Sequence, residues 1–570
     1  MNERITKRLI ILSVFLSSVA VIGYEILAGS VLSNLLGSSI YYFSLIIGFF
    51  LAALGIGGWL SAKIKEGIYE KLVFVEVLIA LVGGSISTVL FGAYAYFFSF
   101  FGNLKFPDII AFLGGLAGAQ LLFTAFSLFF ISFVGVLAGF ELPLYIRILS
   151  EKEILKDAIG RAFFWDYIGA LIISVSLPIF FFANFGLIKT SFLIGIINIL
   201  AAVFVLAASD IKKGKIILPI VFIAVFLVNM LGFINGESLE LFFEKKQFGD
   251  REILYHINSP YQRLTFLKAS DGKISLYING QRQFESGDWD AVYHESFIHP
   301  AMSLALKHEN ILVLGGGDGL ALREILKYPD VKKITLVDID PAIISASSNL
   351  GFMKALNNSA FFDPKVNVVI SDAFKFVEQQ KKEKYDLVFV DFPDPTDDGL
   401  SHLYSKEFYV LLKSVLAENG VSVIQSEAYF GSVQKAILAT LESAGLVGIP
   451  YHPPVYDFFD QNFGFSLVCM NSCSKNDFKN LAVSVPNIIF KNNKLSDIFS
   501  IEPISKYSMG EPEVNSIFHP TIFKLMGDVF AQHYLQSRPI ADIFGQIKTS
   551  QEQTKNKFLK EFFITPDIAI

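Results

Sequence analysis

Residues 310–328 read NILVLGGGDGLALREILKY, and residues 333–340 read KITLVDID. The first stretch is an apolar strand followed by a glycine-rich turn and a helix, and the second is a strand that carries Asp338 about 20 residues further on. In this arrangement the glycines let the backbone approach a ligand, and the acid holds the ribose hydroxyls. A glycine-rich turn can also serve packing alone, but here strand, helix and acid all lie where nucleoside binding needs them. The sequence therefore predicts a nucleoside-binding, Rossmann-like α/β domain.

Two further strands, VNVVI and YDLVFVD, extend the predicted sheet, and carboxylates lie at the end of both. Ligands of open α/β sheets bind at the carboxyl ends of the strands, so these acids should meet in one cleft. Packing a core does not require five carboxylates at four strand ends, whereas a site for cations does. The acids predicted to converge are Asp318, Asp338, Asp372, Asp391 and Asp394.

The region before this domain has a different pattern. Residues 253–284 read as short alternating strands, with hairpin signals at Asp271-Gly272 and Asn279-Gly280. We therefore expect a β-strand subdomain over 250–290 and a Rossmann-like, methyltransferase-type catalytic domain over 291–475. Residues 476–570 form a C-terminal extension to which the sequence assigns no role, with a predicted helix near 514–532.

The first 235 residues are a series of long apolar runs. The whole chain is 53% hydrophobic and only 18% charged, with a mean hydropathy of +0.51, which is more apolar than a soluble protein needs. A membrane-spanning helix needs about 20 apolar residues. The runs predict a multi-span α-helical membrane domain over 1–235 with about seven helices: 9–31, 40–62, 72–97, 112–139, 163–184, 187–208 and 216–234.

Lysines and arginines follow the second, fourth and sixth predicted spans, which places the N-terminus in the cytoplasm by the positive-inside rule. Seven spans would then leave the C-terminal domain outside the cell, where nucleoside substrates are scarce. We therefore expect a re-entrant or extra segment within 72–145, which would make eight, and an interfacial element at 239–243. The resulting prediction is a multi-pass protein of the cell membrane with its catalytic domain on the cytoplasmic side.

Several residues have both a functional and a structural interpretation. Glu25 and Asp166 lie inside apolar runs, where they either bond to neighbouring helices or form a cation pathway. Cys469 and Cys473 are expected to be ordinary thiols, because their spacing is poor for zinc and no metal site is predicted. The net charge of −6, without a basic stripe, gives no reason to expect a nucleic-acid partner.

The second half of the chain resembles the spermidine synthases, or polyamine aminopropyltransferases, and in particular their membrane-anchored branch. The likeness runs from about residue 259 to 465, and more loosely to EVNSIFHP near 514. Six motifs in order carry it: SPYQRLTF, YINGQRQF with DWDAVYHESFIHPAM, LVLGGGDGLALREILKYP, LVDIDPAII, SDAFKF and VDFPDPTDDGLSHLYSKEFY. The resemblance implies transfer of an aminopropyl group from decarboxylated S-adenosylmethionine to a diamine. The products would be spermidine, from putrescine, and methylthioadenosine, with no further cofactor. A homodimer is compatible with it.

The resemblance also implies roles for single residues. Asp391 would be the catalytic acceptor of the amine's proton. Donor binding falls to residues of the strand ends and the glycine-rich turn: Gln262, Gly315, Gly316, Gly317, Asp318, Asp338, Asp372 and Ala373. Placement of the amine falls to three others: Tyr293, His294 and Asp394.

Chemistry supports two of these roles. An amine with a pKa of about 10 is cationic at neutral pH, so a carboxylate such as Asp391 must take its proton before it can attack. Asp318 would favour a donor that ends in a bare ammonium and repel the carboxylate of S-adenosylmethionine, which argues against a methyltransferase. Packing is the structural alternative for Tyr293 and His294, and His299 is expected to be structural.

The sequence leaves the amine open. The loop after Asp391 reads DFPDP where soluble members of the family tend to have DSSDP, and VYDFFDQNFGF over 455–465 replaces a turn that contributes to the amine pocket. Gln425 and Glu427 are further candidates for contacts with the amine. The alternative function is a polyamine transporter or sensor that uses Glu25 and Asp166 and carries a nucleoside-binding soluble domain.

Overall fold

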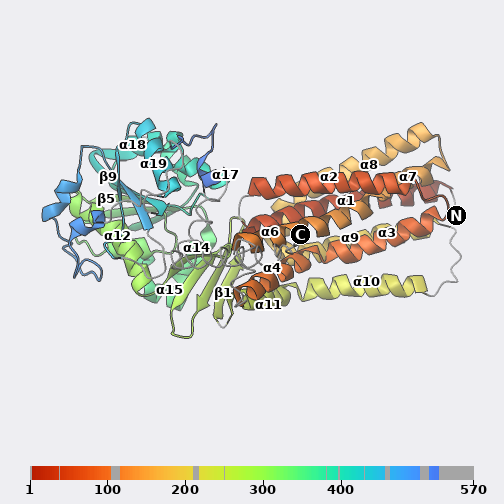
Figure 1. Cartoon of the computed structure of the whole chain (residues 1–570), viewed down its shortest axis with the longest axis horizontal. Helices are drawn as coiled ribbons and strands as arrows, with labels where there is room; N and C mark the ends of the chain where they lie inside the picture. Colours follow the sequence, from red (N-terminus) through yellow and green to blue (C-terminus); the bar gives the residue numbers. More distant parts are fainter. Residues whose placement is uncertain are drawn as a thin grey trace, which may run out of the picture.

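The computed structural model describes residues 3–36, 39–103, 116–209, 217–249, 251–380, 382–395, 398–428, 431–455, 463–500 and 512–525. A bundle of long helices forms one end of the molecule, and two β-sheets with their helices form the other (Figure 1). The predicted loop over 455–465 lies mostly outside the described residues, as do the lysines after the sixth predicted span.

The bundle consists of ten α-helices within the described residues. Their bounds are α1 (Glu3–Leu36), α2 (Ser39–Ser61), α3 (Ile68–Gly84), α4 (Ile86–Asn103), α6 (Leu116–Gly139), α7 (Glu141–Ser150), α8 (Leu155–Ser176), α9 (Phe182–Ala208), α10 (Ile217–Ile234) and α11 (Gly236–Phe248). Four helical segments are long and apolar enough to cross a membrane, and the number is up to six if each of two bent pairs counts as one span. Each of the seven predicted spans overlaps one of these helices.

The longest segment, Leu155–Ala208, contains a sharp break. A π-helical turn (Leu177–Phe181) joins α8 to α9, and Gly186 has φ 68° and ψ −178°, which is far from helical. Both α8 and α9 pack against α1. The segment is therefore two helices of the bundle, as the separate runs at 163–184 and 187–208 predict.

The re-entrant or extra segment expected within 72–145 stays a prediction, because 104–115 lie outside the described residues. Between 72 and 145 the described residues contain α3 and α4, which form one pair bent by 42°, then α6 and the ten-residue α7, which is too short to cross a bilayer. The N-terminus lies at the end of the bundle that is remote from the sheets, and α11 leads into the sheets at the opposite end (Figure 1). Residues 239–243, expected to be interfacial, belong to α11 at this junction.

Small residues bring two helices of the bundle close together. A Cβ atom at Gly57 of α2 would lie 2.0 Å from the carbonyl oxygen of Val136, and one at Gly139 would lie 2.3 Å from that of Leu54. Both distances are too short for any side chain, so α2 and α6 cross on these glycines.

The β-subdomain is an antiparallel meander of β1 (Glu252–Asn258), β2 (Arg263–Lys268), β3 (Ile274–Ile278) and β4 (Gln281–Glu285). The two predicted hairpin turns join β2 to β3 and β3 to β4, with Gly272 and Gly280 at positive φ. Arg263 of β2 forms ion pairs with Glu240 and Glu244 of α11. These pairs tie the sheet to the helical bundle.

The catalytic domain is built on a seven-stranded sheet. Its strands are β5 (Asn310–Gly315), β6 (Lys333–Asp338), β7 (Val366–Ile370), β8 (Tyr385–Asp391), β9 (Leu416–Ala428), β10 (Gly448–Tyr451) and β11 (Phe463–Cys469), in the order β10-β11-β9-β8-β5-β6-β7. Pairing is parallel from β7 to β9 and antiparallel on both sides of β11. Because the strand order reverses between β5 and β8, a ligand crevice is expected at their carboxyl ends.

Helices cover both faces of this sheet. They are α12 (Asp288–Leu304), α13 (Leu320–Ile325), α14 (Pro341–Asn349), α15 (Gly351–Leu356), α16 (Ala373–Gln379), α17 (Asp398–Ser401), α18 (Lys406–Val415) and α19 (Ser432–Ser443). Alternate residues of β5 face opposite sides: Ile311 packs in the core with α12 and α13, and Leu312 packs in the core with α18 and α19. The period of two explains why the strand is apolar throughout.

The described residues after 475 pack into this domain. Phe478 and Ile498 are fully buried in the core on the α12 side, and Ile522 is fully buried on the other face. Of the helix predicted near 514–532, the described part shows one helical turn at 522–525. Cys469 and Cys473 form a disulfide, so the prediction of two ordinary thiols is wrong.

Candidate active site

Every predicted site residue lines one cavity of about 690 Å³ at the carboxyl ends of the strands. This size is typical of small-molecule sites. The predicted residues in its wall are Gln262, Tyr293, His294, Gly315, Gly316, Gly317, Asp318, Asp338, Asp372, Ala373, Asp391, Asp394, Gln425 and Glu427. His299 is outside this wall, as a structural residue should be. The cavity also includes Ser33, Asn34 and Leu35, so the end of α1 forms part of it.

The glycine-rich turn holds β5 and β8 close together. Gly315 has φ +81°, and a Cβ atom there would lie 2.2 Å from the carbonyl oxygen of Asp391. A Cβ atom at Gly317 would lie 2.6 Å from Asp338 Oδ2, which accepts a hydrogen bond from Gly317 N at 3.1 Å. The turn therefore brings the ends of β5, β6 and β8 to one point, and only glycine fits at these positions.

Asp391 lies at the end of β8 and faces Tyr293 of α12. The Tyr293 hydroxyl donates a hydrogen bond of 2.6 Å to Asp391 Oδ1. Burial and the nearby charge of Asp318 raise the pKa of Asp391 to about 6. At neutral pH the group is mostly ionised, yet basic enough to accept a proton, which suits a general base.

The other carboxylates of the cavity share this burial. Burial raises the pKa of Asp338 to about 6 and also raises the pKa values of Asp318 and Asp394. Asp394 accepts a hydrogen bond of 2.7 Å from Gln425 Nε2, and Gln425 Oε1 lies 3.0 Å from the Tyr404 hydroxyl. Several buried acids at one place make the cavity favourable for a cationic ligand.

His294 forms a charged network with residues that the sequence did not single out. Its Nδ1 lies 2.6 Å from Asp290 Oδ1, and Arg323 binds both oxygens of Asp290 at 2.9 and 3.1 Å. Burial lowers the pKa of His294, but the bond to Asp290 outweighs it and the pKa rises to about 9. His294 is thus cationic at neutral pH.

Asp340 is a second residue that sequence reasoning missed. It caps α14 through Ala342 N, and its Oδ2 accepts hydrogen bonds from Gln262 Nε2 at 2.9 Å and from Ser259 at 2.8 Å. It therefore positions Gln262 against the cavity. The sequence does contain a signal for this role: Asp340 directly precedes a proline, and Asp before Pro at the start of a helix is a common cap.

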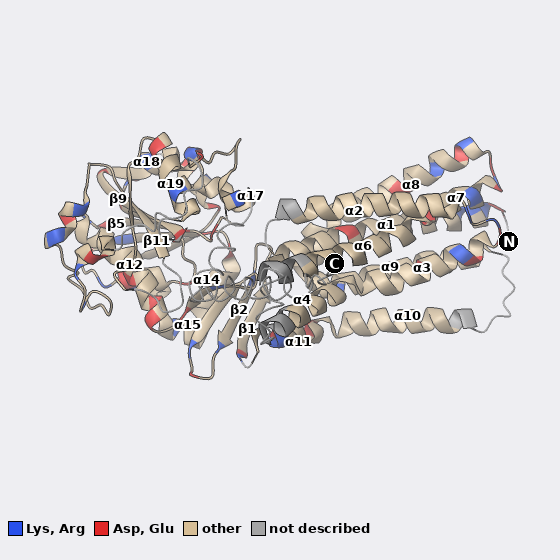
Figure 2. Cartoon of the chain, viewed as in Figure 1, with Lys and Arg blue, Asp and Glu red and all other residues tan. Residues whose placement is uncertain are grey.

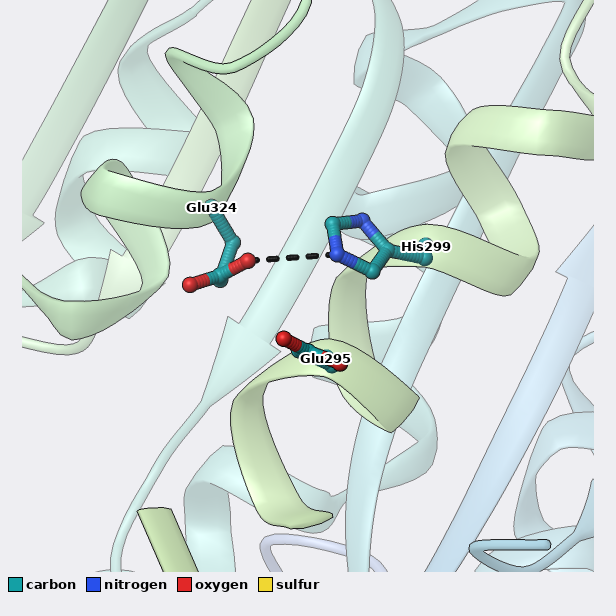
Figure 3. Close-up of side chains that lie close together, drawn as sticks. All are labelled: Glu295, His299 and Glu324. Carbon is teal, nitrogen blue, oxygen red and sulfur yellow. Dashed lines mark ion pairs between the residues drawn. The ribbon is translucent and has the colours of Figure 1, made fainter. Parts of the chain in front are cut away.

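Among the described residues, one group of three His, Cys, Asp or Glu side chains lies close enough together to hold a metal ion: Glu295, His299 and Glu324 (Figure 3). His299 Nε2 lies 3.1 Å from Glu324 Oε2, and Lys327 Nζ lies 2.5 Å from the same atom. Both oxygens of Glu295 accept hydrogen bonds from the backbone around Ile488. Because side chains and backbone already satisfy these carboxylates, the group is a structural network.

The pH dependence of kcat/KM should show the protonation of Asp391, which is bonded to Tyr293. We expect kcat/KM to fall as the pH drops through about 6, because protonated Asp391 cannot accept a proton. Tyr293→Phe removes a hydrogen bond that stabilises the ionised carboxylate, so its acid limb should move to higher pH. The pKa of Asp338 is also about 6, so the limb in wild type alone does not identify the group. A shift of the limb in Tyr293→Phe identifies it as Asp391.

The matched control is Tyr328→Phe. This hydroxyl bonds to His299 at 3.1 Å, outside the cavity wall, and its loss should leave the limb in place. Equal acid limbs in wild type and Tyr293→Phe would show that Asp391 is not the group observed.

Comparison with known proteins agrees with this site. The sequence family described as the spermine/spermidine synthase domain matches residues 290–452. The polyamine aminopropyltransferase of Leptospira interrogans is 35% identical over 455 residues, which cover 79% of this chain and 86% of that protein. The one of Oceanobacillus iheyensis is 36% identical over 453 residues, 79% of this chain and 83% of its own. The crystal structure of spermidine synthase from Thermotoga maritima covers 44% of this chain and 84% of that chain, with 23% identity and a TM-score of 0.38.

The alignment with the Leptospira interrogans protein includes part of the helical bundle, because its 455 residues exceed the length of this chain after α11. The chain belongs to the polyamine aminopropyltransferase family and is an enzyme of that class.

Proposed function

We propose that this aminopropyltransferase uses putrescine as its acceptor and forms spermidine. The observation that carries the proposal is the row of buried carboxylates in the cavity, with Asp391 bonded to Tyr293 and Asp394 bonded to Gln425. Two acids on the same strand end offer one partner to each ammonium group of a diamine. The donor would be decarboxylated S-adenosylmethionine, the substrate of this family.

In the proposed reaction Asp391 accepts a proton from one ammonium group of the diamine. The freed lone pair attacks the propyl carbon next to the sulfonium, a carbon–nitrogen bond forms, and the carbon–sulfur bond breaks. Methylthioadenosine leaves as a neutral thioether. Gln262 and Asp338 hold the sugar of the donor, Asp372 and Ala373 its adenine.

Asp318 would select the donor. Its Oδ1 caps α13 through Leu320 N at 2.9 Å, so the carboxylate is fixed in the wall of the cavity. There it pairs with the free ammonium of the decarboxylated donor and repels a donor carboxylate. Tyr293, His294 and Asp394 place the amine.

The test is to incubate the full-length protein with decarboxylated S-adenosylmethionine and each of a series of diamines and follow the release of methylthioadenosine. We expect the highest kcat/KM with the four-carbon diamine and no release when S-adenosylmethionine replaces the donor. A higher kcat/KM with a shorter or longer amine would contradict putrescine as the acceptor and leave the reaction class intact.

The transporter or sensor alternative receives no support from the relatives, which are named as aminopropyltransferases. In the bundle, Glu25 and Asp166 are only half-buried, and the backbone carbonyl of Asp166 accepts a hydrogen bond of 2.6 Å from Ser18. This bond joins α1 to α8 through the backbone and does not involve the Asp166 carboxylate.

For location we propose that the bundle crosses the cell membrane, in contact with its lipids. Basic side chains gather at the end of the bundle that carries the N-terminus, whereas the middle is nearly free of charge (Figure 2). By the positive-inside rule that end faces the cytoplasm. The sheets lie at the other end of the bundle (Figure 1). The predicted cytoplasmic location of the catalytic domain and the positive-inside rule therefore conflict: the catalytic domain is cytoplasmic only if the basic end faces away from the cytoplasm. The Cys469–Cys473 disulfide also suits an oxidising compartment.

Reporters that are active on only one side of the membrane, fused before residue 1 or after residue 570, should give opposite results. The reason is the position of the N-terminus and the sheets at opposite ends of the bundle. Fusions in the loop between α2 and α3 should agree with the N-terminal reporter and serve as the control. The same signal at both ends of the chain would contradict the arrangement of the helices.

A further inference from the structure

A cluster of oxygen-bearing side chains is buried where α1, α3, α7 and α9 meet. Tyr145 of α7 donates a hydrogen bond of 2.6 Å to Glu76 Oε1 of α3, and Asn198 of α9 donates to Glu76 Oε2. Ser17 of α1 donates to Glu141 Oε2 of α7. We name these five residues the buried oxygen cluster. None of them lines the catalytic cavity.

Part of this cluster has no partner among the described residues. Glu141 Oε1 and Asn198 Oδ1 are buried without a hydrogen bond, and so is the hydroxyl of Tyr24, a neighbour on α1. Glu141 is 4% exposed, and Asn198 and Tyr24 are fully buried. A buried oxygen without a partner costs about 1–3 kcal/mol, so three unpaired oxygens on the helices of this cluster indicate a missing ligand.

The cluster also has unbalanced charge. Glu76 is fully buried, and within the described chain neither Glu76 nor Glu141 forms an ion pair with a basic side chain. Arg147, on the same helix as Glu141, donates instead to the carbonyl oxygen of Ile64 at 2.7 Å. Two carboxylates in an apolar bundle without a cation are too costly to persist in ionised form.

The Glu295–His299–Glu324 group shows how this protein compensates buried acids elsewhere. There Arg323, Lys327 and His299 lie within ion-pair distance of Glu324. In the bundle the same two-carboxylate arrangement has hydroxyl and amide groups around it and no basic side chain. The difference points to a positive charge that comes from outside the chain.

We propose that the buried oxygen cluster, with Tyr24, binds a hard metal cation such as Na⁺ or Ca²⁺. The ligands on offer are carboxylate, amide and hydroxyl oxygens only, which is the set that alkali and alkaline-earth ions prefer. An ion there would join four helices of the bundle. Its role is separate from the reaction in the catalytic cavity.

The test measures the thermal midpoint of the full-length protein in detergent, with NaCl or CaCl₂ against choline chloride at equal ionic strength. A ligand that binds only the folded state raises the midpoint as its concentration increases. We expect one of the two metal salts to raise it by several degrees, and Glu76→Gln and Glu141→Gln to abolish the rise. Glu25→Gln, a half-buried acid on α1, should keep it and is the matched control.

Binding is measured directly by equilibrium dialysis with radioactive Na⁺ or Ca²⁺, with saturating putrescine to occupy the catalytic carboxylates. One ion per chain is expected in wild type and none in the two variants. No metal-specific rise, a rise that persists in both variants, or no bound ion in wild type would overturn the proposal. In the last two cases the carboxylates hold protons or serve packing alone. Methylthioadenosine release in the variants confirms that they fold, and its outcome tests the catalytic proposal independently.

Discussion

Replacing Asp391 by asparagine is expected to lower kcat by roughly 100- to 10,000-fold at neutral pH, the range that a general base contributes. The amide is nearly isosteric and can still accept a hydrogen bond from the Tyr293 hydroxyl, which lies 2.6 Å from Asp391 Oδ1. It cannot accept a proton. The cavity should keep its shape, so KM for the donor should change little, and the loss should fall on kcat.

The size of this loss should depend on pH. An amine with a pKa of about 10 carries its proton at pH 7 and loses it in bulk water as the pH approaches 10. At high pH the substrate arrives already deprotonated, and the enzyme no longer needs an acceptor. We therefore expect the difference between wild type and Asp391→Asn to narrow between pH 7 and 9.5, measured by methylthioadenosine release.

The control is Asp271→Asn at the tip of the hairpin between β2 and β3, where the side chain is exposed and does not line the cavity. Its kcat should equal that of wild type at every pH. An Asp391→Asn enzyme with normal kcat would refute the assignment of the base. A loss that stays constant up to pH 9.5 would instead give Asp391 a positioning role.

The site was accessible from the sequence because the chemistry lies at strand ends. Each acid directly follows an apolar strand, and parallel strands in one sheet bring their carboxyl ends together. The hydrophobic runs fix the strands, and so Asp318, Asp338, Asp372, Asp391 and Asp394 meet in the cavity as predicted. Gln262 lies between β1 and β2 and Tyr293 lies on α12, and here the motifs of the resemblance were needed.

Residues that act through long-range contacts were not accessible. Arg323 reaches Asp290 from another helix, and Asp340 binds Gln262 across 78 positions of sequence. In the bundle the sequence drew attention to Glu25 and Asp166, because they interrupt long apolar runs. The fully buried acids are Glu76 and Glu141, at the ends of such runs. Packing decides which side of a helix faces the bundle, and the hydropathy of the sequence carries no information about that packing.

The disulfide was also missed because it depends on how the chain folds. Cys469 ends β11 and Cys473 lies in the turn after it, so only the path of that turn brings the two sulfurs together. The expected re-entrant or extra segment rested on where substrates occur in the cell. It stays a prediction, as does the number of spans, because the described helices allow four to six spans by length and composition.

Glu324→Gln is expected to destabilise the catalytic domain by about 3–5 kcal/mol, the cost of breaking a buried ion pair. Glu324 is 1% exposed and lies within ion-pair distance of Arg323 at 2.8 Å, Lys327 at 2.5 Å and His299 at 3.1 Å. Glutamine removes the charge that faces Arg323 and Lys327, so Lys327 loses its shortest ion pair and, among the described residues, Arg323 keeps only the pair with Asp290. At about 2–4 °C for each kcal/mol in a domain of this size, the thermal midpoint should fall by roughly 10 °C.

The effect has a pH signature. Burial alone would raise the pKa of Glu324, but the contacts with His299, Arg323 and Lys327 outweigh it and lower the pKa to about 2. A carboxyl group whose pKa is lower in the folded state stabilises the protein above its ordinary pKa near 4.5, and this contribution is lost as the pH falls towards 2. The midpoints of wild type and Glu324→Gln should therefore approach each other between pH 4.5 and 2.

Glu309→Gln provides the matched comparison. Glu309 forms an ion pair of 2.9 Å with Lys332, close in length to the contacts of Glu324, but both partners are exposed. Water screens such a pair, so its loss should leave the thermal midpoint unchanged. If the two variants shift the midpoint equally, burial does not set the strength of these pairs, and the Glu295–His299–Glu324 group cannot be the structural anchor of α12 and α13. A large shift in Glu324→Gln that is restored by added divalent metal would instead return the group to the class of metal sites.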